Sequence, residues 1–125
     1  MLSTATAEIG LREDGIVLTR IRAGASQSLV HARENLDGSI AECAGRKRPL
    51  LVDISSCQPL TPEVRHFYTG RELVDSFCAL GLLAEATPFG KMMGNIYLRV
   101  ARLGVPTRLF TDEPHALEWL RSFLP

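Results

Sequence analysis

The chain has 125 residues, a length typical of one domain that can fold without a disulfide or a metal. Its 14 basic and 14 acidic residues balance, so overall charge favours neither nucleic acid nor an anionic membrane as a partner. The 3 cysteines form no CxxC pair, which excludes a zinc or thioredoxin-type motif and fits a reducing cytoplasm.

We expect neither a signal peptide nor a membrane span. Residues 1–8 lack the basic segment followed by an apolar one that marks a signal peptide. No apolar run approaches the ~20 residues needed to cross a bilayer. One cytoplasmic domain over residues 1–125 is therefore predicted.

Two short strands are predicted over residues 7–13 and 16–22. Asp14-Gly15 between them is a hairpin signal, because glycine supplies the positive φ that a tight turn needs. The second strand alternates apolar and polar side chains, a pattern that we interpret as a strand near the sheet edge.

The next element is predicted to be a helix that begins after Ser26 or Ser28 and runs to about Ala44. Its apolar residues recur at helical spacing and form one stripe. They are Leu29, Ala32, Leu36, Ile40 and Cys43. Gly38 inside the helix weakens it by about 1 kcal/mol relative to alanine. Gly45 is predicted to end it.

The centre of the chain is the apolar run Leu50–Ile54, which predicts a strand buried on both faces of a parallel sheet. A polar turn follows, and Thr61 then caps a helix with Pro62 in its first position. That helix is expected to continue past a glycine to about Asp75. Ligands and reactive groups gather beyond the carboxyl ends of such strands, so residues 53–61 are the first candidate site.

The run Phe77–Ala84 predicts a second buried strand. An amphipathic helix is predicted over residues 89–103, with positive charge on its polar face. Its apolar face comprises Phe89, Met92, Met93, Ile96, Val100 and Leu103. Residues 107–110 predict a last strand, and Thr111 or Asp112 caps the final helix. The inward-facing residues of that helix are Ala116, Leu117, Leu120 and Leu124.

Two strands followed by alternating helices and strands indicate an α/β fold. We expect a mixed, mainly parallel sheet of about five strands, formed by an N-terminal hairpin and then βαβαβα, with helices packed against it.

Enzyme motifs are absent from the sequence. It contains no GxSxG, GxGxxG, Walker or HExxH pattern. The three histidines are predicted on separate helix surfaces or first turns. One alternative is a thiol activity in which Cys57 pairs with His66, because a helix start at Thr61 would lower the thiol pKa. Nothing in the sequence supplies an orienting third partner, so no catalytic residue, metal or cofactor is predicted.

Asp53, Ser55, Ser56 and Thr61 are the candidate contact residues at the carboxyl end of the central strand. Because backbone N–H groups at a helix start favour anions, the hydroxyls there are candidates for phosphorylation or anion binding. In the alternative interpretation Thr61 only caps the helix and the serines satisfy the backbone of the turn.

The helix over residues 89–103 is a second candidate, since methionine-rich faces make adaptable binding surfaces. Phe89, Met92, Met93 and Ile96 would line a site for an apolar ligand. Core packing is the alternative interpretation. Three basic groups are few for binding to anionic lipid.

The element order and several local motifs resemble the SpoIIAA-like family, small bacterial proteins of the STAS/Sec14-like class. The most specific motifs are Leu51-Val52-Asp53 and Thr107-Arg108-Leu109-Phe110-Thr111-Asp112-Glu113, followed by Ala116-Leu117 and Trp119-Leu120. The resemblance covers nearly the whole chain and implies a mixed-sheet α/β sandwich. Its Sec14-like members suggest an apolar ligand held beneath a helix.

Anti-sigma-factor antagonists of this family carry Asp-Ser-Ser-Gly in the turn after the matching strand, and a partner kinase phosphorylates the serine. Here the corresponding region is Leu60-Thr61-Pro62-Glu63, with Pro62 about where that serine would be. The resemblance therefore implies the fold without the phosphoserine switch.

The leading hypothesis is a non-catalytic regulatory module that acts by binding a protein partner or by self-association. The alternative is binding of a lipid or other small apolar ligand under the helix at 89–103. Nucleic acid is not expected as a partner.

Overall fold

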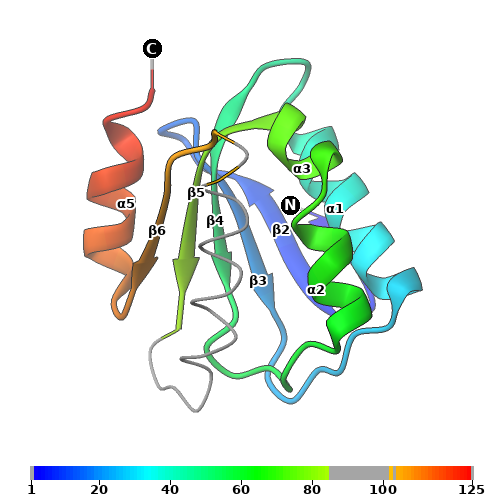
Figure 1. Ribbon diagram of the computed structural model, residues 1–125. Helices are drawn as coiled ribbons and strands as arrows, with labels where there is room; N and C mark the ends of the chain where they lie inside the picture. Colours follow the sequence, from blue (N-terminus) through cyan, green and yellow to red (C-terminus); the bar gives the residue numbers. More distant parts are fainter. Residues whose placement is uncertain (1, 85–101, 103, 125) are drawn as a thin grey trace.

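The computed structural model describes residues 2–84, 102 and 104–124. Six strands form one sheet in chain order, β1-β2-β3-β4-β5-β6 (Figure 1). They span Leu2–Ser3, Ala7–Leu11, Val17–Ile21, Arg48–Asp53, Phe77–Leu83 and Thr107–Phe110. The first three strands pair antiparallel, and β3 to β6 pair in parallel. The predicted mainly parallel sheet with an antiparallel hairpin is confirmed. The additional strand is β1, whose 2 residues are too few to show a periodicity.

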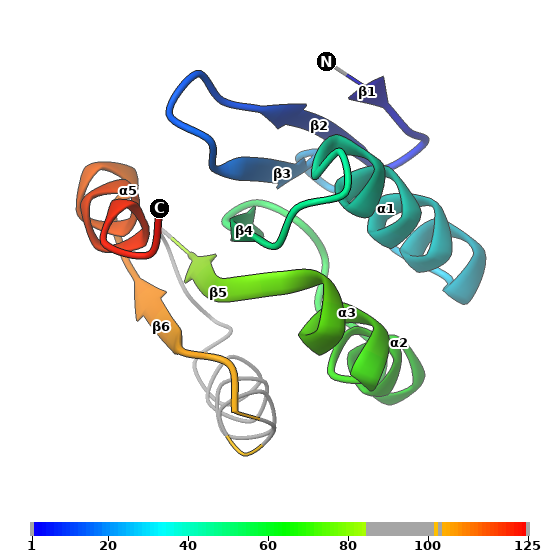
Figure 2. The ribbon, with the colours of Figure 1, turned by 90° about the horizontal axis from the view of Figure 1, so that it is seen from above.

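Helices cover both faces of the sheet (Figure 2). Helices α1, α2 and α3 pack on one face and α5 on the other. They span Leu29–Glu42, Pro62–Tyr68, Arg71–Ser76 and Glu113–Arg121. Apart from residue 102, the helix predicted over 89–103 lies outside the described residues. Among the helices that the structure describes, none is long and apolar enough to cross a bilayer.

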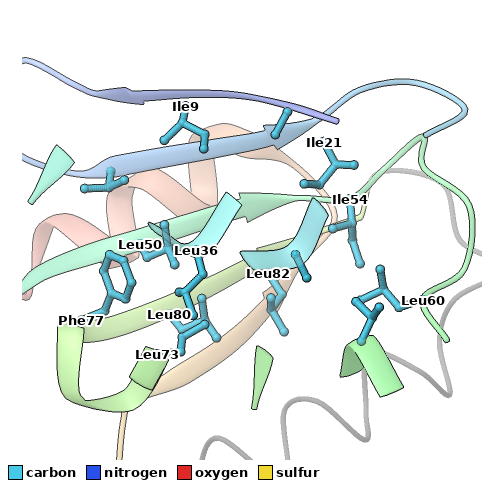
Figure 3. Close-up of a cluster of buried hydrophobic side chains, with 14 of the residues drawn as sticks. Ile9, Ile21, Leu36, Leu50, Ile54, Leu60, Leu73, Phe77, Leu80 and Leu82 are labelled. Atoms are coloured by element: carbon cyan, nitrogen blue, oxygen red, sulfur yellow. The ribbon is translucent and has the colours of Figure 1, made fainter. Parts of the chain in front are cut away.

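The core is divided into two clusters by the sheet. On the α1 side, β4 contributes Leu50 and the following Ile54 (Figure 3). On the α5 side, Leu51 packs with Leu83 and Leu120. Strand β4 is therefore buried on both faces, as its apolar run predicts.

Strand β3 lies inside the sheet, so its predicted place near the edge is wrong. It pairs with β2 on one side and with β4 on the other. Its polar residues have partners there: Thr19 contacts Ser39 at 2.6 Å, and Arg20 contacts Asp53 and Glu113. Alternating polarity marks an edge strand only when the polar side chains are left to solvent.

Helix α1 begins at Ser28, whose Oγ accepts a hydrogen bond from the His31 N–H, while the His31 ring accepts one from the Ser28 N–H. The buried stripe starts at Ala32, because Leu29 in the first turn keeps 41% of its surface exposed. Gly38 has a packing role that its helix propensity does not reveal. A Cβ there would lie 2.7 Å from Cδ2 of Leu2 and 2.9 Å from Cδ1 of Ile9, so a larger residue would force these two side-chain ends to shift.

The helix predicted from Thr61 to Asp75 is two helices. Thr69 ends α2, and Gly70 in an extended conformation precedes α3. The caps at Thr61 and Asp112 are both formed, through hydrogen bonds from the N–H groups of Val64 and His115.

Candidate functional site

Two loops meet at the carboxyl edge of the sheet, the end toward which the parallel strands β3 and β4 both run. Residues 23–28 follow Arg22 in the connection from β3 to α1, and residues 54–61 connect β4 to α2. The Gly24 N–H donates to Ser56 O at 2.8 Å, and the Gln58 N–H donates to Ala25 O at 2.9 Å. We call these two joined segments the loop pair. They lie side by side at the bottom of Figure 1.

The loop pair has no charged side chain. Ser26, Ser56, Gln58 and Thr61 are exposed on it. The first turn of α1 follows directly and adds Leu29 and, with 70% of its surface exposed, Val30. Val30 is an apolar residue that lies off the apolar stripe of α1. Its position off that stripe could have identified it from the sequence as an exposed contact residue. Together these residues form an ordered surface of small polar groups beside an apolar spot.

Asp53 lies at the end of β4, and its side chain is only 8% exposed. Its Oδ2 accepts a hydrogen bond from Arg20 at 2.5 Å. Its Oδ1 accepts from the Ser55 N–H at 2.9 Å and from the Ser55 hydroxyl at 2.6 Å. The second Nη of Arg20 binds Glu113 at 2.6 Å. Asp53 thus joins β3 to the β4–α2 turn, and Arg20 joins this pair to the start of α5.

The predicted contact residues of the turn are therefore separated into two kinds. Asp53 and Ser55 bind each other, whereas Ser56 and Thr61 are exposed. Thr61 Oγ1 accepts the Val64 N–H at 3.4 Å, so its cap role is observed. Phosphorylation or anion binding there stays a prediction.

Cys57 is poorly placed to act as a nucleophile. It is 5% exposed, and its thiol donates to Ile54 O at 3.5 Å. Burial raises the pKa of this thiol, which keeps the sulfur protonated. His66 is exposed on α2, and the described structure shows no hydrogen bond between it and Cys57.

The second predicted site lies outside the described residues, namely Phe89, Met92, Met93 and Ile96. An apolar ligand beneath that helix stays a prediction. Within the described part of the chain, no group of three or more His, Cys, Asp or Glu side chains could hold a metal ion.

Comparisons with known proteins agree with this architecture. A family model described as "Domain of unknown function (DUF7793)" matches residues 10–124. A crystal structure of an uncharacterised DUF3478 protein with a SpoIIAA-like fold, from Shewanella loihica PV-4, superposes with a TM-score of 0.64. The two sequences are 18% identical, and the match covers 96% of this chain and 98% of the other. No curated protein matches the chain. The SpoIIAA-like fold that the motifs predict is confirmed.

Proposed function

The chain belongs to the family "Domain of unknown function (DUF7793)", and we propose that it is a non-catalytic, regulatory protein-interaction module. The proposed contact surface is the loop pair together with the first turn of α1. Its partner is either another protein or a second copy of the chain.

The observation that carries this proposal is the pair of backbone hydrogen bonds between the two loops, from Gly24 to Ser56 and from Gln58 to Ala25. Binding by a mobile loop loses conformational entropy, and a surface that is already ordered loses less. Loops held by a rigid scaffold are also where proteins most often place their contacts.

The chemistry of the surface favours a protein partner over other macromolecules. The centres of protein–protein interfaces are depleted in charged residues, and the loop pair has none. Nucleic acid binding needs lysines and arginines on the phosphates. Exposed Val30 would supply an apolar anchor within such an interface.

Two features support a module of this kind in the cytoplasm. The protonated, buried thiol of Cys57 argues against the thiol-enzyme alternative. Cys43, Cys57 and Cys78 are all free, which fits a reducing compartment.

Val30→Asp tests the proposal, with Leu11→Asp as the matched control. Val30 and Leu11 are both exposed, and Leu11 lies at the opposite end of the sheet from the loop pair. An acidic residue in the first turn of α1 is favourable to the helix dipole, so Val30→Asp should leave the fold intact.

Crosslinking in the native cell and mass spectrometry identify the partner, and sedimentation velocity measures self-association. Calorimetry on the purified components then measures the affinity. We expect Val30→Asp to weaken the association at least tenfold and Leu11→Asp to leave it unchanged. A monomer without a partner, or equal affinities for the two variants, would contradict the proposal.

A further inference from the structure

A cavity of about 50 Å³ lies between the sheet and helices α1, α2 and α3, on the face away from α5. Its wall is mostly apolar and includes Ile21, Leu36, Val52 and Leu80. Figure 3 shows much of this wall, with Leu36 facing the leucines of β4 and β5. Close-packed interiors leave few voids larger than one water molecule. A water needs roughly 10–15 Å³, so this void is several times larger than a single water needs.

One end of the cavity is polar. Gln27, Asn35 and Tyr68 line it, and Tyr68 donates its hydroxyl hydrogen to Gln27 Oε1. Asn35 Nδ2 donates to the same oxygen at 3.2 Å and to Thr6 at 2.8 Å. Gln27 and Asn35 are 7% and 1% exposed. Burying these polar groups costs free energy that an entirely apolar core would avoid. Polar side chains placed in a core in this way are found most often at functional sites.

The hydrogen-bond directions show what this end can offer to a ligand. Ser39 Oγ donates its hydrogen to Asn35 O at 2.7 Å, so across the 2.6 Å contact with Thr19 the hydroxyl of Thr19 is the donor. The oxygen of Thr19 therefore keeps lone pairs that can accept a hydrogen bond. The amide oxygen of Gln27 is held by Tyr68 and Asn35, which leaves its Nε2 hydrogens as donors. The lining therefore offers the hydroxyl group of a ligand an acceptor at Thr19 and a donor at Gln27.

The described part of the lining also disfavours charged ligands. Tyr68 is the one titratable group among the described residues that line the cavity. Burial raises the pKa of Tyr68 to about 12, so its hydroxyl stays neutral. Among the described lining residues, a charged ligand would find no opposite charge to compensate the cost of its desolvation.

We propose that this cavity is a binding site for a small neutral molecule with an apolar body and a single hydroxyl group, of the class of short aliphatic alcohols. Its volume is about a third of the ~150 Å³ engineered cavity that holds benzene, which limits the ligand to a few heavy atoms. The site adjoins the proposed protein contact, because Gln27, Ile54 and Leu60 of the loop pair line the cavity from the inside, while binding of a small ligand there requires no protein partner.

The test is a titration of the full chain, carrying ¹³C-labelled methyl groups, with 1-propanol. We expect saturable shifts of the methyl signals of Ile21, Leu36 and Val52. The α5-side leucines, Leu51 and Leu120, are the internal control and should not respond. Affinity should rise roughly fourfold from ethanol to 1-propanol, since each buried methylene adds about 0.8 kcal/mol. Propionate should bind at least tenfold more weakly than 1-propanol.

Two variants probe the two ends of the cavity. Val52→Ile adds a methyl group to the wall and should weaken 1-propanol binding at least tenfold, whereas the same change at exposed Val30 should not. Thr19→Val removes the acceptor and should weaken binding of 1-propanol while leaving that of xenon, an apolar probe, unchanged.

Several results would overturn the proposal. They are methyl signals that do not shift, shifts of equal size in both core clusters, propionate binding as tight as that of 1-propanol, and wild-type affinity in folded Val52→Ile. Val52→Ile keeps the test decisive if Thr19→Val fails to fold.

Discussion

Asp53 is singled out by the sequence, but its role is clear only from the residues that surround it in the structure. As a carboxylate at the end of a buried strand, it is predicted to be a contact residue. In the structure its oxygens are used by Arg20 and Ser55, and 8% of its side chain is exposed. It orders the surface from beneath, because it holds the turn from which the exposed Ser56 projects.

Asp53→Ala is therefore expected to lower the free energy of unfolding by about 2–3 kcal/mol, since it removes hydrogen bonds to a charged acceptor. Asp37→Ala is the matched control. Asp37 is 59% exposed in its pair with Arg33, where solvent screens the interaction. Asp37→Ala should therefore lower the free energy of unfolding much less than Asp53→Ala. Urea denaturation measures both. Equal destabilisation by the two substitutions would show that the Asp53 network contributes no more than a surface ion pair.

Helix ends are the elements for which local sequence is most informative, because a cap depends on residues within one turn. Ser28, Thr61 and Asp112 all cap the helices they precede. The break between α2 and α3 is different. A glycine at position 70 fits either a weakened continuous helix or a break between two helices. The structure has the break, and α3 packs Leu73 and Val74 into the α1-side core.

The cap of α5 also contains an ion pair that depends on pH. Asp112 accepts the His115 backbone N–H and lies 2.7 Å from the His115 ring. The backbone hydrogen bond from His115, followed by its ring, lowers the pKa of Asp112, and the side-chain hydrogen bond to Asp112 raises the pKa of His115. Because folding raises the pKa of His115, its interaction stabilises the fold fully below the pKa of the unfolded state. This stabilisation is lost as pH rises through the pKa of the folded state. Because folding lowers the pKa of Asp112, its interaction stabilises the fold fully above the pKa of the unfolded state. This stabilisation is lost as pH falls through the pKa of the folded state. Both are present between about pH 4 and 6.5.

Asp112→Asn keeps a capping oxygen but removes the charge. We expect the NMR titration midpoint of His115 to lie above 6.5 in the wild-type protein and to fall toward that value in the variant. Asp37→Asn should not move it. An unchanged midpoint in Asp112→Asn would mean that the pair does not form in solution.

At the scale of the whole molecule, the candidate surface exists because parallel strands end together. Residues 23–28 and 54–61 are distant in sequence, and the parallel pairing of β3 with β4 brings both to the same edge. The two cross-loop hydrogen bonds then join them. Neither segment has a motif that identifies it alone.

Amide hydrogen exchange tests this joint structure. The amides of Gly24 and Gln58 should exchange with similar protection, because one opening of the loop pair breaks both hydrogen bonds. The Ser26 amide, for which the described residues provide no backbone acceptor, should exchange faster. Asp53→Ala should accelerate Gly24 and Gln58 together. If only one of these amides responded, the two loops would be separate units.

The sequence by itself determined the α/β class, the hairpin and three strands, predicted at 50–54, 77–84 and 107–110 and found at 48–53, 77–83 and 107–110. It also determined the cap at Thr61, and it placed the caps of the first and last helices to within one or two residues. These features follow from periodicity, turn residues and hydrogen bonds between near neighbours, which are local. Tertiary structure alone decided the interior place of β3, the close packing of Gly38 against β1 and β2, the loop pair and the cavity beneath α1. Each of these depends on which distant side chains meet. Arg20 finds Asp53, Gly38 meets Ile9, and Tyr68 reaches Gln27 only after the sheet has brought their elements together.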